Sequence, residues 1–473
     1  MRIVGRKREK DVLNACLFSK RPEFVVIFGR RRVGKTYLIK EFFKNQFSFY
    51  ATGLSDEKTA GQLKAFQASL QSYGCKERTM PSDWFEAFMR LRQLLCEDQV
   101  YRDPISGKRV VFLDELPWMD TARSDFKSAL DYFWNSWGSS QEDLLFIVCG
   151  SATSWIINHM LKDRKGFHNR ITRRIQLLPF SLKECEELLE NNDVVMSREQ
   201  IIECYMIFGG IPYYLNLMDP RLSLAQNVDE LLFKSYGDLY DEYQALFYSL
   251  FSKPESHIAI MEALAETKSG KTRQELAKQT GLGSGSVLSK DLEELEQCGF
   301  IHRYVHYELS KNNAIFQLTD PFVLFSLRFL TKQNRGSWLD YIHSPSYYAW
   351  RGNAFEICCL NHISQIKAAL GISGVDTMEY AWRSKYSVPG AQIDLLIDRK
   401  DGIINLCEMK DTDEPFAMDK NEYEKLMNRL TAFSGETKTK KAIHLTLVSV
   451  NGMKHHKYSS VFQTVITGDD LFT

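Results

Sequence analysis

Three short apolar runs in the first 150 positions have the length and the flanks of buried strands. They cover residues 24–28, 110–113 and 144–149. Unbroken apolar runs of this length are typical of parallel strands that are covered on both faces. A helix-like stretch over residues 37–43 follows the first run. The pattern therefore predicts a parallel α/β sheet in this part of the chain.

A glycine-rich segment joins the first strand to the helix-like stretch. Residues 29–36 read Gly-Arg-Arg-Arg-Val-Gly-Lys-Thr, the spacing of a phosphate-binding P-loop. Gly29 and Gly34 let backbone N–H groups close around phosphates, and the helix that starts at Lys35 directs its positive dipole end toward them. We expect Lys35 to supply a mobile positive charge and Thr36 a hydroxyl ligand for Mg²⁺. The segment predicts binding of a nucleoside triphosphate.

Acidic and small polar residues follow the other two strands. Asp114 ends the second strand, where it would lie beside Thr36 and hold Mg²⁺. Glu115 is placed where a carboxylate can orient or deprotonate the attacking water. Ser151 follows the third strand and is expected either to sense the γ-phosphate or to cap the next helix. These residues predict ATP hydrolysis; the alternative is a core strand that ends in two solvated acids.

Three arginines come next, at Arg170, Arg173 and Arg174. Any of them could reach a γ-phosphate, in its own chain or from a neighbouring subunit, as an arginine finger does. We favour Arg170 for this role. The alternative is that all three are ordinary surface arginines.

These motifs together resemble the prokaryotic AAA-type ATPases related to the STAND signalling group. The resemblance covers nearly the whole chain. Besides the motifs above, it rests on Val4-Gly5-Arg6 with Glu9, on Leu-Pro-Phe-Ser at 178–181 and on Gly-Gly-Ile-Pro-Tyr-Tyr-Leu at 209–215. In that family the opening Gly-Arg lies near the adenine, and the later Gly-x-Pro belongs to a helical lid. The resemblance therefore implies that Gly5, Arg6 and Pro212 contribute to nucleotide binding.

Composition and charge limit the classes of protein to consider. The 473 residues suggest roughly three domains. The 60 basic and 60 acidic residues balance, so no global charge attracts nucleic acid or a membrane. The ten cysteines have no C-x-x-C spacing and suggest neither a zinc site nor a disulfide framework, which fits a reducing cytosol. A charged first segment and the lack of a long apolar stretch predict a cytoplasmic protein without signal peptide or membrane helix.

The middle of the chain has the pattern of a winged helix-turn-helix. Residues 272–275 form a capping box, residues 281–283 a turn, and residues 300–304 the start of a wing. The second helix has Val287, Leu288, Leu292 and Leu295 at helical spacing. It also carries four acids, Asp291, Glu293, Glu294 and Glu296, against one Lys290. Because such a helix would be repelled by a polyanion, we favour a packing or lid module over a DNA reader.

The last third contains a second group of chemically active residues. Residues 392–397 and 403–410 are expected to form a hairpin, with Glu408 and Lys410 on one face and Asp394 next to Glu408. Two acids can hold Mg²⁺, and Lys410 can orient a water or stabilise charge on a phosphate. The pattern resembles the PD-(D/E)xK nuclease fold, which implies Glu356, on a helix expected over 353–366, as a further metal ligand. The alternative is an exposed turn beside an ordinary Glu–Lys surface pair.

We therefore predict an α/β protein with four parts. These are a P-loop, AAA-like ATPase core at 1–178, a helical lid at 179–250, a winged helix at 251–331 and a nuclease-like α/β domain at 332–473. The expected function is an ATP-hydrolysing switch coupled to a domain that processes or binds nucleic acid. The alternatives are a STAND-like signalling ATPase with a non-catalytic C-terminal binding domain and a DNA-binding regulator that works through the winged helix.

The expected cofactors are ATP and Mg²⁺, with Mn²⁺ as an alternative at the C-terminal site. DNA or RNA, a protein partner or a second copy of the chain are the candidate partners, and no membrane is expected.

Overall fold

The computed structural model describes residues 3–162, 167–251, 253–283, 285–304, 307, 314–331, 335–384, 386–455 and 457–473. It divides into two compact units, Met1–Pro179 and Phe180–Thr473. Among the described residues, no helix is both long and apolar enough to cross a lipid bilayer.

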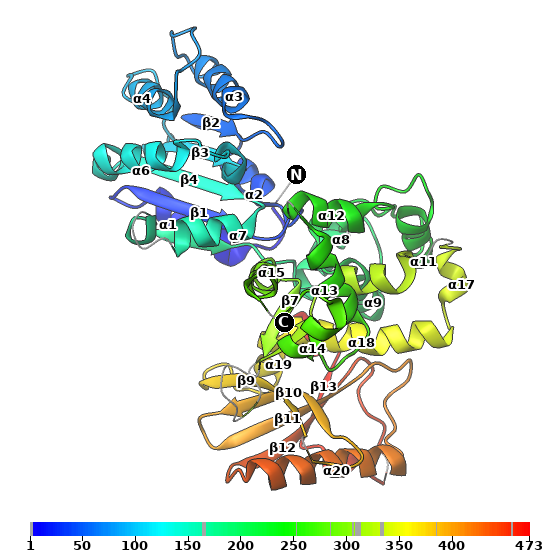
Figure 1. Ribbon diagram of the computed structural model, residues 1–473. Helices are drawn as coiled ribbons and strands as arrows, with labels where there is room; N and C mark the ends of the chain where they lie inside the picture. The colour runs from blue at the N-terminus through cyan, green and yellow to red at the C-terminus, as the bar shows by residue number, and fades with distance from the viewer. Residues whose placement is uncertain are drawn as a thin grey trace. The chain divides into compact units, whose positions relative to one another are not determined.

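The first unit is built on a five-stranded sheet with the order β2-β3-β4-β1-β5 (Figure 1). All its strand pairs are parallel. The strands are β1 (Glu23–Phe28), β2 (Phe49–Thr52), β3 (Arg109–Asp114), β4 (Leu144–Gly150) and β5 (Arg173–Gln176). The predicted parallel α/β sheet is confirmed, and its central strands β1, β3 and β4 are buried along their whole length.

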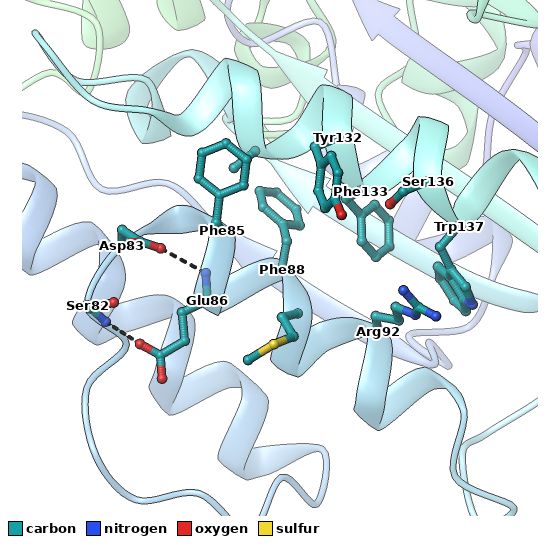
Figure 2. A pocket seen from close by; sticks show the side chains of 12 residues that line it. Ser82, Asp83, Phe85, Glu86, Phe88, Arg92, Tyr132, Phe133, Ser136 and Trp137 are labelled. Atoms are coloured by element: carbon teal, nitrogen blue, oxygen red, sulfur yellow. Dashed lines mark hydrogen bonds between the residues drawn. The ribbon is translucent and has the colours of Figure 1, made fainter.

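Helices cover the sheet, and aromatic rings fill the space between. They are α1 (Lys7–Leu17), α2 (Lys35–Phe42), α3 (Thr59–Ser72), α4 (Trp84–Leu95), α5 (Leu116–Met119), α6 (Phe126–Ser136) and α7 (Thr153–Ile156). Phe24 of β1 lies with its ring centroid 4.9 Å from that of Trp134 on α6. Between α4 and α6 is a cavity of about 530 Å³, which side chains such as Phe85, Arg92 and Tyr132 line (Figure 2).

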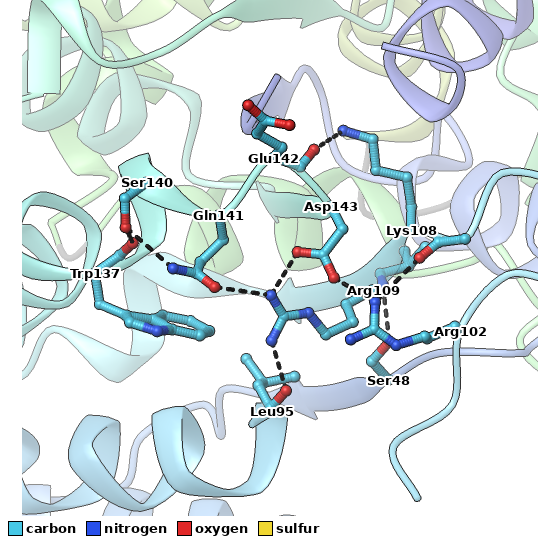
Figure 3. Close-up of polar contacts among 12 residues, drawn as sticks. Ser48, Leu95, Arg102, Lys108, Arg109, Trp137, Ser140, Gln141, Glu142 and Asp143 are labelled. Atoms are coloured by element: carbon cyan, nitrogen blue, oxygen red, sulfur yellow. Dashed lines mark hydrogen bonds and ion pairs between the residues drawn. The ribbon is translucent and has the colours of Figure 1, made fainter. Parts of the chain in front are cut away.

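Polar contacts fix the amino-terminal ends of the central strands (Figure 3). Arg109, at the start of β3, donates hydrogen bonds to the carbonyl of Leu95 at 2.6 Å and to the carboxylate of Asp143 at 2.5 Å. The ammonium group of Lys108 donates to the carbonyls of Arg21 and Glu142, both at 2.7 Å. These contacts tie together the edge of the sheet opposite to the P-loop.

The second unit begins with a group of helices. They are α8 (Leu182–Asn191), α9 (Arg198–Phe208), α10 (Pro212–Leu215), α11 (Leu224–Val228) and α12 (Glu242–Leu250). Three more helices follow, α13 (Glu255–Ala265), α14 (Arg273–Thr280) and α15 (Ser286–Gln297). With them lies a small antiparallel sheet of β6 (Lys271–Thr272), β7 (Ile301–Tyr304) and β8 (Ile315–Leu318).

The sequence pattern of this middle segment is only partly reproduced. The capping box at Thr272 and Glu275 is present. On α15, Leu288, Leu292 and Leu295 are buried as expected. Val287, which belongs to the same spacing pattern, is 59% exposed. At about 100° per residue, position 287 lies beyond the edge of the face that residues 288–295 bury, so spacing alone does not decide its burial.

A second five-stranded sheet, with the order β13-β12-β11-β10-β9, occupies the end of the chain. Before it come α16 (Pro321–Phe325), α17 (Trp338–Tyr341), α18 (Pro345–Asn361) and α19 (Ile363–Ala369). The strands are β9 (Thr377–Arg383), β10 (Gln392–Arg399), β11 (Ile403–Lys410), β12 (Ala442–Ser449) and β13 (Thr464–Thr467). Strands β9 to β11 pair antiparallel, whereas β11 to β13 pair parallel, with α20 (Lys420–Thr437) as the crossover from β11 to β12.

The predicted hairpin at 392–410 is confirmed by β10 and β11. The helix expected at 353–366 is instead two helices that are separated at His362. The first starts earlier than expected, at Pro345, because Ser344 caps it and proline is favoured in the first helical turn.

Candidate functional site

The P-loop lies at the carboxyl end of β1, and two glycines give it its path. Gly29 has φ 148°, and a Cβ atom there would lie 2.2 Å from the carbonyl oxygen of Leu177. Gly34 has φ 90° and caps the start of α2. A side chain at either position would be strained or would collide. The loop therefore keeps its backbone close to the first turn of α2, where anions are favoured.

Lys35 is buried and folds back over this loop. Its ammonium group donates to the carbonyl oxygens of Gly29 and Arg30, each at 2.9 Å. The positive charge is thus already held where phosphate oxygens would enter. The same carbonyls would release the ammonium group when a stronger, charged acceptor arrives.

Thr36 and Asp114 meet, although 78 positions separate them in sequence. The Thr36 hydroxyl donates to the Asp114 carboxylate, at 2.8 Å to Oδ2 and 3.1 Å to Oδ1. The Cys149 thiol donates to Asp114 Oδ1 at 2.7 Å, and burial together with Asp114 raises the pKa of this thiol well above its usual value. A hydroxyl and a carboxylate are oxygen ligands of the kind Mg²⁺ prefers, so the pair fits that ion. Sequence reasoning missed Cys149 because a thiol at the end of a buried strand has no distinguishing local pattern.

Glu115 and Ser151 form a second pair at the same edge. The Glu115 carboxylate accepts hydrogen bonds from the Ser151 backbone N–H at 3.0 Å and from its hydroxyl at 2.8 Å. Glu115 has φ 46° and ψ 48°, a left-handed conformation that is costly for a residue with a Cβ atom. The N-cap of α7 is Ala152, so the alternative role of Ser151 as a helix cap is wrong.

Gly5 and Arg6 lie beside the P-loop in the same unit. Both have positive φ, 58° and 52°. Arg6 is buried, and its guanidinium group donates to the carbonyl of Val33 at 3.2 Å. Pro212 begins α10 in the other unit, so its role in nucleotide binding stays a prediction.

Arg170 lies away from these residues. The chain after it enters β5 at the amino-terminal half of the sheet, where the Thr172 N–H donates to the Phe24 carbonyl and Arg173 lies opposite Val25. Arg170 itself forms an ion pair with Asp131 of α6. Because the strands are parallel, this is the half of the sheet away from Lys35. The structure thus contradicts the expectation that Arg170 contacts the γ-phosphate of its own chain, and a contact from a neighbouring subunit stays a prediction.

A second cluster lies on β10, β11 and α18. The antiparallel ladder starts with Leu395 opposite Cys407, and Asp394 and Glu408 are the next residues at this end of it. Lys410 lies 3.2 Å from Glu408 on the same strand. Burial raises the pKa of Asp394, and Glu408 acts in the same direction. Burial, with Asp394 close by, raises the pKa of Glu356 to about 7. The structure therefore brings together all four residues predicted for this site.

Several charged residues around this cluster were missed by sequence reasoning. Lys268, in the turn between α13 and β6, lies with Nζ 3.0 Å from Glu356 Oε1. Arg429 of α20 pairs with Glu408, and Glu422 pairs with Lys410 at 3.2 Å. No local pattern points to these partners, because Lys268 and Glu356 are 88 residues apart. The cluster therefore balances four acids with basic groups from three separate segments.

Comparison with known proteins matches the first part of the chain to an ATPase family. A family model described as an ATPase domain predominantly from Archaea matches residues 3–218. An uncharacterized protein of Methanocaldococcus jannaschii is 23% identical over 329 residues, which cover 69% of this chain and 68% of the relative. An uncharacterized ATP-binding protein of the same organism is 42% identical over 43 residues, 9% of this chain and 73% of that one.

A solved structure shares the fold. The Walker-type ATPase of Pyrococcus abyssi superposes with a TM-score of 0.50 at 17% identity, over 69% of this chain and 96% of that chain. Together with the parallel sheet and the P-loop, these matches show that the chain contains a P-loop ATPase domain.

Proposed function

We propose that this protein binds ATP with Mg²⁺, hydrolyses it at the carboxyl edge of the first sheet, and couples this cycle to a nuclease-like C-terminal domain. The proposal of ATP binding and hydrolysis is supported by the hydrogen bond between Thr36 and Asp114, which lies beside the P-loop that holds Lys35. A hydroxyl from the first turn of α2 and a carboxylate from the end of β3, next to an ammonium group, make a site for a metal-bound triphosphate.

Each residue at this edge has a separate task in the proposed reaction. Lys35 binds the β- and γ-phosphates, while Thr36 and Asp114 would hold Mg²⁺, which supplies charge that polarises the phosphate oxygens. Glu115 orients the attacking water and accepts its proton as the new bond to phosphorus forms and the bond to the ADP oxygen breaks. Ser151 holds the Glu115 carboxylate in a defined position before substrate binds.

We infer that residues 332–473 have a nuclease-like fold and that Asp394, Glu408 and Glu356 bind Mg²⁺ or Mn²⁺. Three carboxylates, one of which has a pKa raised to about 7, form an all-oxygen donor set suited to these ions. Among the described residues, Glu356 Oε2 is buried without a hydrogen-bond partner, as expected of an atom that awaits a cation. Lys410 would lie beside the water that attacks a phosphodiester bond.

We interpret residues 251–331 as a winged helix that serves to pack against the C-terminal domain. The turn that carries Lys268 accepts hydrogen bonds from Arg383 at the carbonyls of Ser269 and Gly270, at 3.0 and 3.2 Å. Gln317 donates to the carbonyl of Lys268 at 3.0 Å. These contacts hold the Lys268 ammonium group at Glu356, which supports a role in the adjacent site over a role in reading DNA.

The test is to incubate the full chain with single- and double-stranded DNA and RNA, with Mg²⁺ or Mn²⁺, in the presence and absence of ATP. We expect cleavage that is lost in Asp394→Asn and is kept in Glu424→Gln, a change of an exposed acid on α20. Lys35→Ala shows whether cleavage depends on ATP. If ATP is hydrolysed but no nucleic acid is cut under any condition, the C-terminal domain is a binding module, as in the signalling alternative.

A further inference from the structure

Two of the four acids on α15 point into the protein. Asp291 is 5% exposed, and the Glu294 side chain is 17% exposed. Both face the imidazole of His257 on α13, which is itself buried. His257 Nε2 lies 3.0 Å from Glu294 Oε2 and 3.8 Å from Asp291 Oδ1. One ligand atom from each residue can be chosen so that all three lie within 4.8 Å of one another.

The Asp291 carboxylate is incompletely hydrogen-bonded among the described residues. Within the described part of the chain, Asp291 Oδ2 is buried and has no hydrogen-bond partner. At 3.8 Å, the contact of Oδ1 with His257 is too long for a hydrogen bond. A buried carboxylate without partners is costly, since it has lost its hydration. Lys290, 3.6 Å from Glu294, is largely exposed and neutralises only that acid. A further positive charge beside His257 and Glu294 would therefore stabilise the Asp291 carboxylate.

We propose that His257, Asp291 and Glu294 form a binding site for Zn²⁺. Ligands of a tetrahedral zinc, with bonds of about 2.0–2.1 Å, lie roughly 3.3 Å apart, and the separations of 3.0 and 3.8 Å bracket this value. One imidazole nitrogen and two carboxylate oxygens suit zinc, whereas Mg²⁺ prefers oxygen ligands alone. A water would complete the coordination. No cysteine takes part, so the spacing of the cysteines in the sequence carries no sign of this site.

The place of the cluster suggests what the ion does. His257 belongs to α13, whereas both acids belong to α15, and α14 separates the two helices along the chain. The ring of Phe251 stacks on the His257 imidazole at a centroid distance of 3.8 Å and holds its orientation. Zinc would therefore clamp α13 to α15 in the module that these helices form with α14 and the three-stranded sheet. The site lies outside the proposed ATP and nuclease sites, and its function is structural.

The test measures zinc on the full chain. Protein stripped with chelator is loaded with Zn²⁺ without nucleotide, desalted, and analysed by inductively coupled plasma mass spectrometry. We expect Asp291→Asn, a change of nearly equal volume, to hold one equivalent less than wild type. Glu293→Gln, a change of an exposed acid on the same helix, is the matched control and keeps the full amount. Glu408→Gln shows how much zinc is bound by the C-terminal cluster. We expect this variant to keep the equivalent of zinc that depends on Asp291.

Equal zinc in wild type and Asp291→Asn overturns the proposal and leaves the direct contacts of His257 with the two acids as the explanation of the cluster. If Asp291→Asn does not fold, the proposal is tested instead by the visible absorption spectrum of Co²⁺ bound to the wild-type chain. Visible bands of a tetrahedral cobalt site with nitrogen and oxygen ligands support the proposal, and their absence overturns it.

Discussion

The ammonium group of Lys35 is held by two carbonyl oxygens of its own loop, so its charge is in place before any nucleotide binds. An incoming phosphate replaces neutral acceptors with charged ones, and charge-assisted hydrogen bonds are about twice as strong as neutral ones.

We expect Lys35→Ala to weaken ATP binding by at least about 10–100-fold, since hydrogen bonds to charged groups contribute about 1.5–3 kcal/mol each. Isothermal titration calorimetry with Mg-ATP measures this. Lys44→Ala removes an exposed lysine just after α2 and should leave the affinity unchanged. Equal affinity in wild type and Lys35→Ala would show that the loop does not bind phosphate.

Glu115→Gln should separate binding from chemistry. The amide keeps the shape of the side chain and its contact with Ser151 but cannot accept a proton from water. We expect ATP affinity close to that of wild type and single-turnover hydrolysis slower by about 10²–10⁴-fold. Hydrolysis at the wild-type rate would exclude Glu115 as the base.

Binding of Mn²⁺ at the C-terminal cluster should depend on pH through Glu356. With a pKa of about 7, this carboxyl is neutral below that pH and cannot serve as an anionic ligand. Affinity should therefore rise as pH increases, by up to about tenfold per unit below pH 7, and level off above it. Electron paramagnetic resonance measures the Mn²⁺ affinity in the absence of nucleotide. Only the part of the signal that is lost in Asp394→Asn is assigned to the C-terminal cluster. In Glu356→Gln the dependence should be lost over the same range.

At the scale of elements, His362 links α8 to α18. Its Nδ1 donates to the carbonyl of Cys358 at 2.7 Å, and its Nε2 accepts from the N–H of Leu182 at 2.9 Å. The imidazole must be neutral to do both. Burial lowers the pKa of His362 to about 4.

This contact should make folding stability sensitive to acid. Between about pH 6.5 and 4 the unfolded chain binds a proton at His362 and the folded chain does not, so stability falls as pH falls through this range. The loss approaches about 3 kcal/mol at most. Urea unfolding at about pH 7 and pH 4.5 measures it by comparison with His362→Gln, which should show a smaller fall. His343→Gln, at an exposed histidine, should behave as wild type.

Elements with a strong local pattern could be predicted, and those without one could not. The apolar runs of β1, β3 and β4 are buried on both faces and stand out in the sequence. Strand β5 has two arginines in four residues and was missed, because its pairing with β1 depends on the rest of the fold. The inward direction of Asp291 was also missed, since helical spacing does not reveal that a histidine lies opposite.

The candidate sites follow the same rule. The residues of the P-loop are contiguous and could be read directly, whereas the cation that balances Glu356 comes from Lys268, far away in sequence. The prediction that Arg170 contacts the γ-phosphate of its own chain was wrong because of the topology of the sheet. A residue just before a parallel strand lies at the amino-terminal edge, and the phosphate site lies at the other edge.

For the whole molecule, the division into two compact units predicts two thermal transitions. Mg-ATP at about 100 times its dissociation constant stabilises the unit that binds it by about 2.7 kcal/mol. For a unit of this size we expect one transition to rise by roughly 5–10 °C while the other stays in place. Differential scanning calorimetry checks this, and Lys35→Ala should abolish the shift. A single transition that moves as a whole would show that the two units unfold together.

The left-handed backbone at Glu115 affects which variants of this protein a stability screen would recover. A residue chosen for stability alone would be glycine or asparagine at φ 46°, and glutamate there costs about 1 kcal/mol or more. Glu115→Asn relieves this strain but gives up the carboxylate that accepts two hydrogen bonds from Ser151, so the variant should melt close to the wild-type temperature and turn over ATP poorly. A screen for heat resistance would keep such variants, while a screen for ATP turnover would remove them. A thermostability campaign on this protein should leave position 115 out of its library.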